Sequence, residues 1–229
     1  MMKLSIVAGV VALAGTLIGT RAFIGFLVRR GYGQFVRDDG PATHSAKRGT
    51  PTMGGLAIVL AVVLAYALAH LVNLELPSYS GLLLLGLLVA CGLLGFIDDW
   101  TKISHKRSLG LTSRGKLLGQ LVIGAAFGTA ALFGPNAYGD TPASTAISFT
   151  RDIEWLRLPL VAAIVWMTFM VIASSNAVNL TDGVDGLATG ALTMVFGAYT
   201  LINIWQRNQW CRPGSTAGPM CYQVRDPWD

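Results

Sequence analysis

The chain has 229 residues, of which 53% are hydrophobic and 13% are charged, and its formal net charge is +5. An average soluble domain carries about 25% charged residues, and the apolar residues here form long runs, so composition excludes an ordinary soluble domain. The positive charge lies at the ends of those runs, where membrane topology accounts for it, and we expect no nucleic-acid partner.

Six apolar segments are long enough to cross a bilayer, which takes about 17–25 residues. We place them at residues 4–28, 53–72, 80–97, 116–133, 158–174 and 184–204. The predicted fold class is therefore an all-α, polytopic membrane helical bundle, with residues 1–229 forming a single transmembrane domain. The 27 glycines agree with this prediction, because small residues let membrane helices approach closely.

Lysine and arginine in the connecting segments predict the orientation of the helices. The segments after the first and third spans are rich in both residues, whereas the segment after the second span has neither. Because cytoplasmic loops carry the excess of basic residues, we expect these two segments in the cytoplasm and the N-terminus outside. The tail after the sixth span then lies outside, where Cys211 and Cys221 could form a disulfide; two free thiols are the alternative.

Two neighbouring carboxylates, Asp98 and Asp99, come directly after the third apolar run. Acids are costly near a bilayer and at the negative end of a helix dipole, so this pair indicates a functional site with a cation nearby, either Mg²⁺ or a lysine. Lys102 and Lys106 could share a face with the pair if the helix continues. A purely structural cluster of ion pairs is the alternative.

The segment before the second span, residues 38–55, is rich in Gly, Pro and Thr. Lys47 and Thr52, with His44 and Thr50, offer donors to phosphate oxygens, and the N-terminus of a helix favours anions. The alternative is a solvated loop whose basic residues only set the topology.

Residues 176–185 place two amides, a hydroxyl and two carboxylates in one short segment, which we read as a loop. Such a loop could chelate a metal or hydrogen-bond a ribose and a base edge, although the spacing is not that of an EF-hand. The alternative is that Asp182 or Asp185 caps the sixth span.

Together, these three segments resemble the polyprenyl-phosphate N-acetylhexosamine-1-phosphate transferases, and the resemblance extends to about Gly197. The stretch Gly49–Gly55 favours the phospho-N-acetylmuramoyl-pentapeptide transferase branch. A branch that uses UDP-N-acetylglucosamine is the alternative, because it shares the paired aspartates and the Asn- and Asp-rich segment.

The resemblance implies transfer from UDP-N-acetylmuramoyl-pentapeptide to undecaprenyl phosphate, giving lipid I and UMP for peptidoglycan synthesis. It also implies Mg²⁺, a bacterial plasma-membrane location with the active-site loops in the cytoplasm, and a homodimer. Asp98 would act as the base or as the group that orients the lipid phosphate, and Asp99 would assist or bind the metal. The substrate-binding residues implied are Lys47, Thr52, Lys102, Lys106, Lys116, Asn176, Asn179, Asp182 and Asp185.

The family is expected to have about ten spans, each long enough to cross the bilayer. Its later part supplies a further metal-binding aspartate and a His-rich cytoplasmic loop, whereas this sequence has three histidines and no such cluster. We therefore expect these 229 residues alone to lack transferase activity, either as a fragment of an enzyme or as a truncated remnant.

Overall fold

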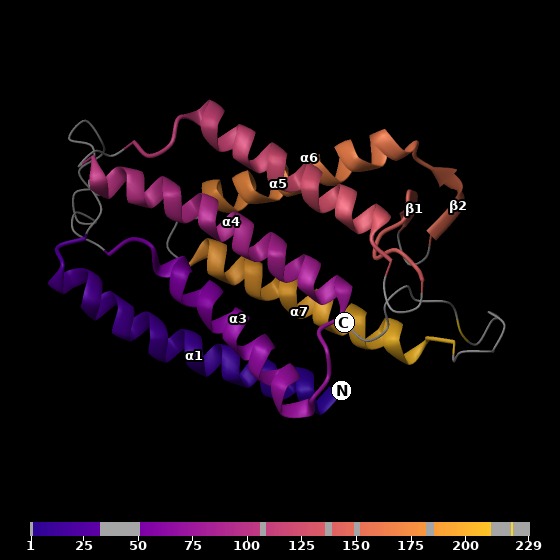
Figure 1. Ribbon diagram of the computed structural model, residues 1–229, viewed down its shortest axis with the longest axis horizontal. Coiled ribbons are helices and arrows are strands. Elements are labelled where there is room, and N and C mark those ends of the chain that lie inside the picture. Colours follow the sequence, from indigo (N-terminus) through magenta and orange to yellow (C-terminus); the bar gives the residue numbers. More distant parts are fainter. Residues whose placement is uncertain are drawn as a thin grey trace. The chain divides into compact units, whose positions relative to one another are not determined.

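Six long helices account for most of the chain in the computed structural model, which describes residues 2–32, 51–105, 109–135, 139–148, 152–181, 186–211 and 221. The helices are α1 (Met2–Arg29), α3 (Gly54–Asn73), α4 (Tyr79–Ser104), α5 (Ser113–Phe133), α6 (Leu160–Thr181) and α7 (Leu187–Asn208) (Figure 1). Each is long and apolar enough to cross a membrane, so the predicted all-α, multi-pass class and its six spans are confirmed.

Two helices run well past the ends that the apolar pattern indicates. The third span was expected to end at Ile97, but α4 continues to Ser104 and takes the acidic pair into its last turns. The fifth span was expected to end at Ser174, but α6 continues to Thr181. In both cases the polar residues lie on a regular helix, and the expected break at the end of the apolar run is absent.

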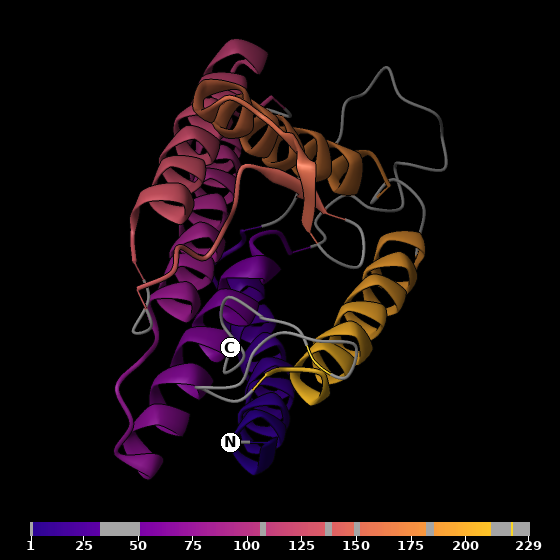
Figure 2. The same ribbon diagram turned by 90° about the vertical axis from the view of Figure 1, so that its right-hand side faces the viewer.

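The chain divides into two compact units, the first of which comprises Met1–Pro77 and Leu84–Ile123. In this unit α1 and α3 run side by side (Figure 1 and Figure 2). Small residues allow the close approach: a Cβ added at Gly15 would lie 3.5 Å from Ala61, and one added at Gly92 of α4 would lie 3.0 Å from Val59 of α3. At Gly92 an added methyl group would press on Val59, so glycine allows close packing of α4 on α3 there, whereas at Gly15 the same group would make an ordinary van der Waals contact.

The second unit comprises Ser78–Leu83 and Gly124–Asp229. Its helices also meet at glycine, since a Cβ at Gly124 of α5 would lie 3.0 Å from the Cα atom of Thr168 of α6. Between α5 and α6 the chain forms an antiparallel pair of strands, β1 (Ala146–Ser148) and β2 (Asp152–Arg157), which the sequence did not predict.

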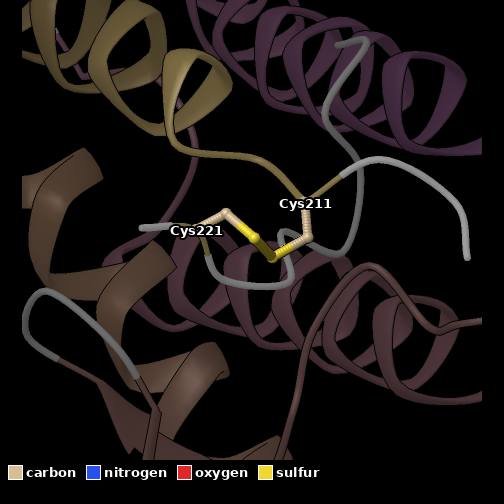
Figure 3. Close-up of a disulfide and its surroundings, with 2 residues drawn as sticks. All are labelled: Cys211 and Cys221. Carbon is tan, nitrogen blue, oxygen red and sulfur yellow. A yellow bond between two sulfur atoms is a disulfide. The ribbon is translucent and has the colours of Figure 1, made fainter. Parts of the chain in front are cut away.

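A disulfide joins Cys211 to Cys221 in this second unit, just beyond the end of α7 (Figure 3). Of the two outcomes that the sequence left open, the structure therefore has the bridged one. Cys211 is buried, with 5% of its surface exposed. The third cysteine, Cys91, lies within α4 as a free thiol.

Candidate active site

The last two turns of α4 hold Asp98, Asp99 and Lys102 together. Side chains three and four residues apart lie on the same face of a helix, so one lysine can reach both acids. The Lys102 ammonium nitrogen lies 2.7 Å from Oδ2 of Asp98 and 2.9 Å from Oδ1 of Asp99. The lysine thereby supplies the cation that two acids at the negative end of a helix require.

Asp98 is the more enclosed of the two acids, with 7% of the residue exposed. Its Oδ1 atom accepts a hydrogen bond of 2.9 Å from the backbone N–H of Leu111, which lies in the segment leading to α5. The ammonium of Lys116, in the first turn of α5, lies 3.6 Å from Oδ2. The two oxygens therefore have different partners: Oδ1 faces a backbone amide and Oδ2 faces two lysines.

Asp99 is more open, with 28% of its side chain exposed. Its Oδ2 atom accepts a hydrogen bond of 3.3 Å from the backbone N–H of Met53, at the N-cap of α3. Next to Met53, the hydroxyl oxygen of Thr52 is buried and has no hydrogen-bond partner among the described residues. A buried hydroxyl without a partner could accept a polar ligand, because leaving such a group unpaired costs free energy.

The structure thus brings four of the predicted site residues into one ionic cluster, formed by Asp98, Asp99, Lys102 and Lys116. Thr52 precedes Met53, the residue whose N–H bonds to Asp99. Four other predicted residues, Lys47, Lys106, Asp182 and Asp185, lie outside the described residues. Helix α4 ends at Ser104, and the predicted contact of Lys106 with the acidic pair stays a prediction.

Asn176 and Asn179 lie on α6 rather than on the expected loop. The side-chain amide of Asn176 donates a 2.8 Å hydrogen bond to the carbonyl oxygen of Ile172, one turn earlier, which satisfies part of the amide within the helix. Asn179 is exposed. The N-cap of α7 is Gly186, in the left-handed region at φ 83°.

The sequence did not indicate two of the hydrogen-bond donors to the acidic pair, namely the backbone N–H groups of Met53 and Leu111. Every residue except proline has such a group, so residue type carries no signal of its use. The glycine before Leu111 was the one available hint, since glycine often marks a close approach of the backbone to another group.

Carboxylate oxygens are the ligands that Mg²⁺ prefers, and the ion is usually held by one or two carboxylates together with substrate phosphates. The adjacent carboxylates of Asp98 and Asp99 are ligands of this kind. Within the described ranges, no group of three or more His, Cys, Asp or Glu side chains is placed to hold a metal.

Six apolar helices, one of which carries a carboxylate–lysine cluster with a buried aspartate near its end, define a multi-pass membrane protein with an ionic site. The model described as glycosyl transferase family 4 matches residues 80–221, and the model described as phospho-N-acetylmuramoyl-pentapeptide-transferase signature 1 matches residues 47–59. The chain therefore belongs to glycosyl transferase family 4.

Among curated proteins, the chain is 58% identical over 228 residues to the phospho-N-acetylmuramoyl-pentapeptide-transferase of Cutibacterium acnes. It is 52% identical over 231 residues to the protein of that name from Streptomyces avermitilis. Both matches cover 100% of this chain and 64% of the relative, so similarity extends past Gly197, where the expected resemblance ended. The chain thus spans 64% of the length of these two relatives.

Proposed function

We propose that the chain belongs to an enzyme that transfers phospho-N-acetylmuramoyl-pentapeptide from UDP-N-acetylmuramoyl-pentapeptide to undecaprenyl phosphate. The products are lipid I and UMP, which places the enzyme in peptidoglycan synthesis. One observation carries the proposal: the Met53 N–H, inside the segment that matches the transferase signature, is hydrogen-bonded to Asp99 of the ionic cluster. Two regions that each indicate this family thus meet at one site.

In this proposal Asp98 accepts the proton of the lipid phosphate or orients that phosphate for attack. The Leu111 amide and Lys102 hold the carboxylate in place. Phosphoryl transfer depends on positioning and on neutralising phosphate charge more than on covalent work by the protein, so a fixed carboxylate between two lysines suits it. The geometry is compatible with direct attack and with a two-step route through the enzyme.

We further propose that Asp99 holds Mg²⁺ together with substrate phosphate. The ion would supply neutralisation of the phosphate charge. Thr52 would contact a phosphate oxygen through its buried hydroxyl, which has no partner among the described residues. Lys116 would contact another phosphate oxygen from the edge of the ionic cluster. Lys47 and Lys106 would add phosphate contacts, and Asn176, Asn179, Asp182 and Asp185 would line the nucleotide-sugar pocket.

The proposal includes an orientation, with the N-terminus outside, the ionic cluster at the cytoplasmic face, and the disulfide outside. Basic residues in the connecting segments and the oxidising character of the outer compartment support it. Single cysteines placed at either end of α4, probed in intact cells with a membrane-impermeant maleimide, test this orientation. Labelling of the end that carries Asp98 from outside would contradict it. A homodimer is also proposed, and its test is the mass of the purified protein by light scattering.

The rival donor is UDP-N-acetylglucosamine, used by a related branch. The match of residues 47–59 to the phospho-N-acetylmuramoyl-pentapeptide-transferase signature favours the muramoyl donor. A second rival, an inactive remnant, keeps the cluster without the chemistry. A single assay distinguishes the proposed function from both rivals.

That assay uses a chimera in which residues 1–229 replace the matching part of the Cutibacterium acnes relative. The relative supplies the remaining 36% of its length, and the unmodified relative is the positive control. Membranes containing the chimera should form UMP and a lipid-linked product from UDP-N-acetylmuramoyl-pentapeptide and undecaprenyl phosphate, and should lose this activity with EDTA. A folded chimera that forms no product would overturn the proposal, whereas product from UDP-N-acetylglucosamine alone would favour the first rival. The 229-residue chain, assayed in parallel, tests the expectation that it lacks activity by itself.

A further inference from the structure

Gly110 lies directly against Asp98. A Cβ atom added to Gly110 would collide with Oδ1 of Asp98, and it would lie 2.7 Å from both the Cγ atom and the backbone oxygen of the same residue. Real Cβ atoms essentially never come within 3.0 Å of such neighbours. Any side chain at position 110 would therefore push the chain segment away from the carboxylate.

The close approach has a direct consequence for the next residue. Because Gly110 can touch Asp98, the backbone N–H of Leu111 comes within 2.9 Å of Oδ1 and donates a hydrogen bond to it. The bond spans 13 residues and connects the end of α4 to the segment that starts α5. Oδ1 is thereby occupied, and Oδ2 is left to face Lys102 at 2.7 Å and Lys116 at 3.6 Å.

This constraint is not shared by the glycines of α4 in general. A Cβ at Gly86 or Gly95 would meet nothing within 4 Å. Gly95 lies one turn before Asp98 on the same helix, so it provides a matched comparison. The requirement for glycine at position 110 thus comes from its close approach to Asp98, both to the carboxylate and to the backbone oxygen of that residue.

We propose that Gly110 is a positioning residue, which lets the Leu111 amide fix one oxygen of Asp98 so that the other is presented to substrate. This inference rests on the proposed function, in which Asp98 acts on the lipid phosphate. A carboxylate held on one side only can rotate about its Cβ–Cγ bond and exchange its two oxygens. With the amide in place, the orientation of the oxygen that faces Lys102 and Lys116 is fixed. A displacement of about 1 Å at a reacting group can lower a rate about 100-fold, so this contact is expected to matter for turnover.

The first experiment measures amide hydrogen exchange at Leu111 in the purified 229-residue chain, which requires no activity. The Leu111 amide should be protected in the unaltered chain and in Asp98→Asn, because an amide oxygen still accepts the hydrogen bond. It should lose protection in Gly110→Ala and in Asp98→Ala, whereas Gly95→Ala should behave like the unaltered chain. Asp98→Ala leaves Gly110 in place, so it tests the contact even if Gly110→Ala does not fold. Unchanged protection in Asp98→Ala would overturn the inference.

The second experiment measures kcat and KM in the chimera described above. Gly110→Ala should lower kcat on the order of 100-fold while KM for the UDP-linked donor stays within a small factor, because Asp98 is misplaced and the donor site is intact. Combining Gly110→Ala with Asp98→Asn should lower kcat no further than Asp98→Asn alone. Loss of Leu111 protection with unchanged kcat would overturn the positioning role. A chimera without any activity would instead count against the proposed function, while the exchange result would still decide whether Gly110 shapes the site.

Discussion

The backbone N–H of Met53 donates a hydrogen bond to Oδ2 of Asp99, 3.3 Å away and 46 residues further along the chain. Met53 has a left-handed conformation at φ 68°, which costs a residue with a side chain about 1–2 kcal/mol relative to glycine. Its side chain is nonetheless buried, with 7% exposed. Burial and the bond to Asp99 together stabilise this conformation, so the start of α3 and the acidic pair of α4 depend on each other.

The substitution Asp98→Asn tests the catalytic assignment. Asparagine keeps the size of the side chain and an oxygen for the Leu111 amide, but it can neither take a proton nor carry charge. In the chimera, we expect the rate of lipid-product formation to fall on the order of 100-fold or more, the range typical of losing a general base. Asp152→Asn, at the exposed start of β2, is the control and should leave the rate unchanged. A rate for Asp98→Asn within twofold of the unaltered chimera would refute the assignment.

The substitution Lys102→Met tests whether the lysine compensates the two acids. Its removal leaves Asp98 buried without its nearest cation, which we expect to lower the free energy of unfolding by about 1–2 kcal/mol. The expected loss of unfolding free energy is small because 32% of the Lys102 side chain is exposed and solvent screens its attraction to Asp98. The measurement is thermal unfolding in detergent, where each kcal/mol corresponds to roughly 2–4 °C in Tm. Arg114→Met, at an exposed position of α5, is the control, and an equal change in both variants would contradict the prediction.

Leu74 offers a stabilising substitution. This residue caps the C-terminus of α3 with φ 53°, and 89% of its surface is exposed, so its side chain loses little when removed. Leu74→Gly should raise the free energy of unfolding by about 1 kcal/mol, because glycine adopts the left-handed region without a steric penalty. Leu76→Gly is the matched control: Leu76 is 92% exposed and is not among the residues with positive φ, so it should be neutral or slightly destabilising. Equal effects at both positions would count against the backbone explanation.

The disulfide between Cys211 and Cys221 can be tested by alkylation. Under non-reducing, denaturing conditions, only Cys91 should react with a maleimide, whereas all three cysteines should react after reduction. The bridge closes a segment with a sequence separation of ten residues, for which loop entropy predicts a stabilisation of about 3 kcal/mol. The double variant Cys211→Ser, Cys221→Ser should therefore unfold at a lower temperature than Cys91→Ser. Three reactive thiols before reduction would contradict the bridge.

The six helices could be predicted from the length of the apolar runs, but two of their ends could not. Asp98, Asp99 and Lys102 look like a break after the third run, yet their charges offset each other at helical spacing, so α4 continues through them. Asn176 looks like part of a loop, yet its amide bonds to a carbonyl oxygen within α6. The strand pair between α5 and α6 was missed because β1 has three residues, too few for a recognisable alternation.

The part of the candidate site on α4 was predictable because Asp98, Asp99 and Lys102 are close in sequence and lie on one face of the helix. The contacts from Met53 and Leu111 were not predictable, since they use backbone groups and come from elsewhere in the chain. Local spacing can indicate which side chains share a face. It cannot indicate which distant backbone amide will complete their hydrogen bonds.

The ionic cluster contains two carboxylates and two ammonium groups, so its formal charges cancel. A phosphate that approaches these four side chains therefore meets no net attraction from them at long range. It gains a favourable contact only if it draws a lysine away from a carboxylate or arrives with a cation of its own. The same pairing that makes the acids tolerable at the end of α4 thus makes the four side chains selective for anions that bring compensating charge.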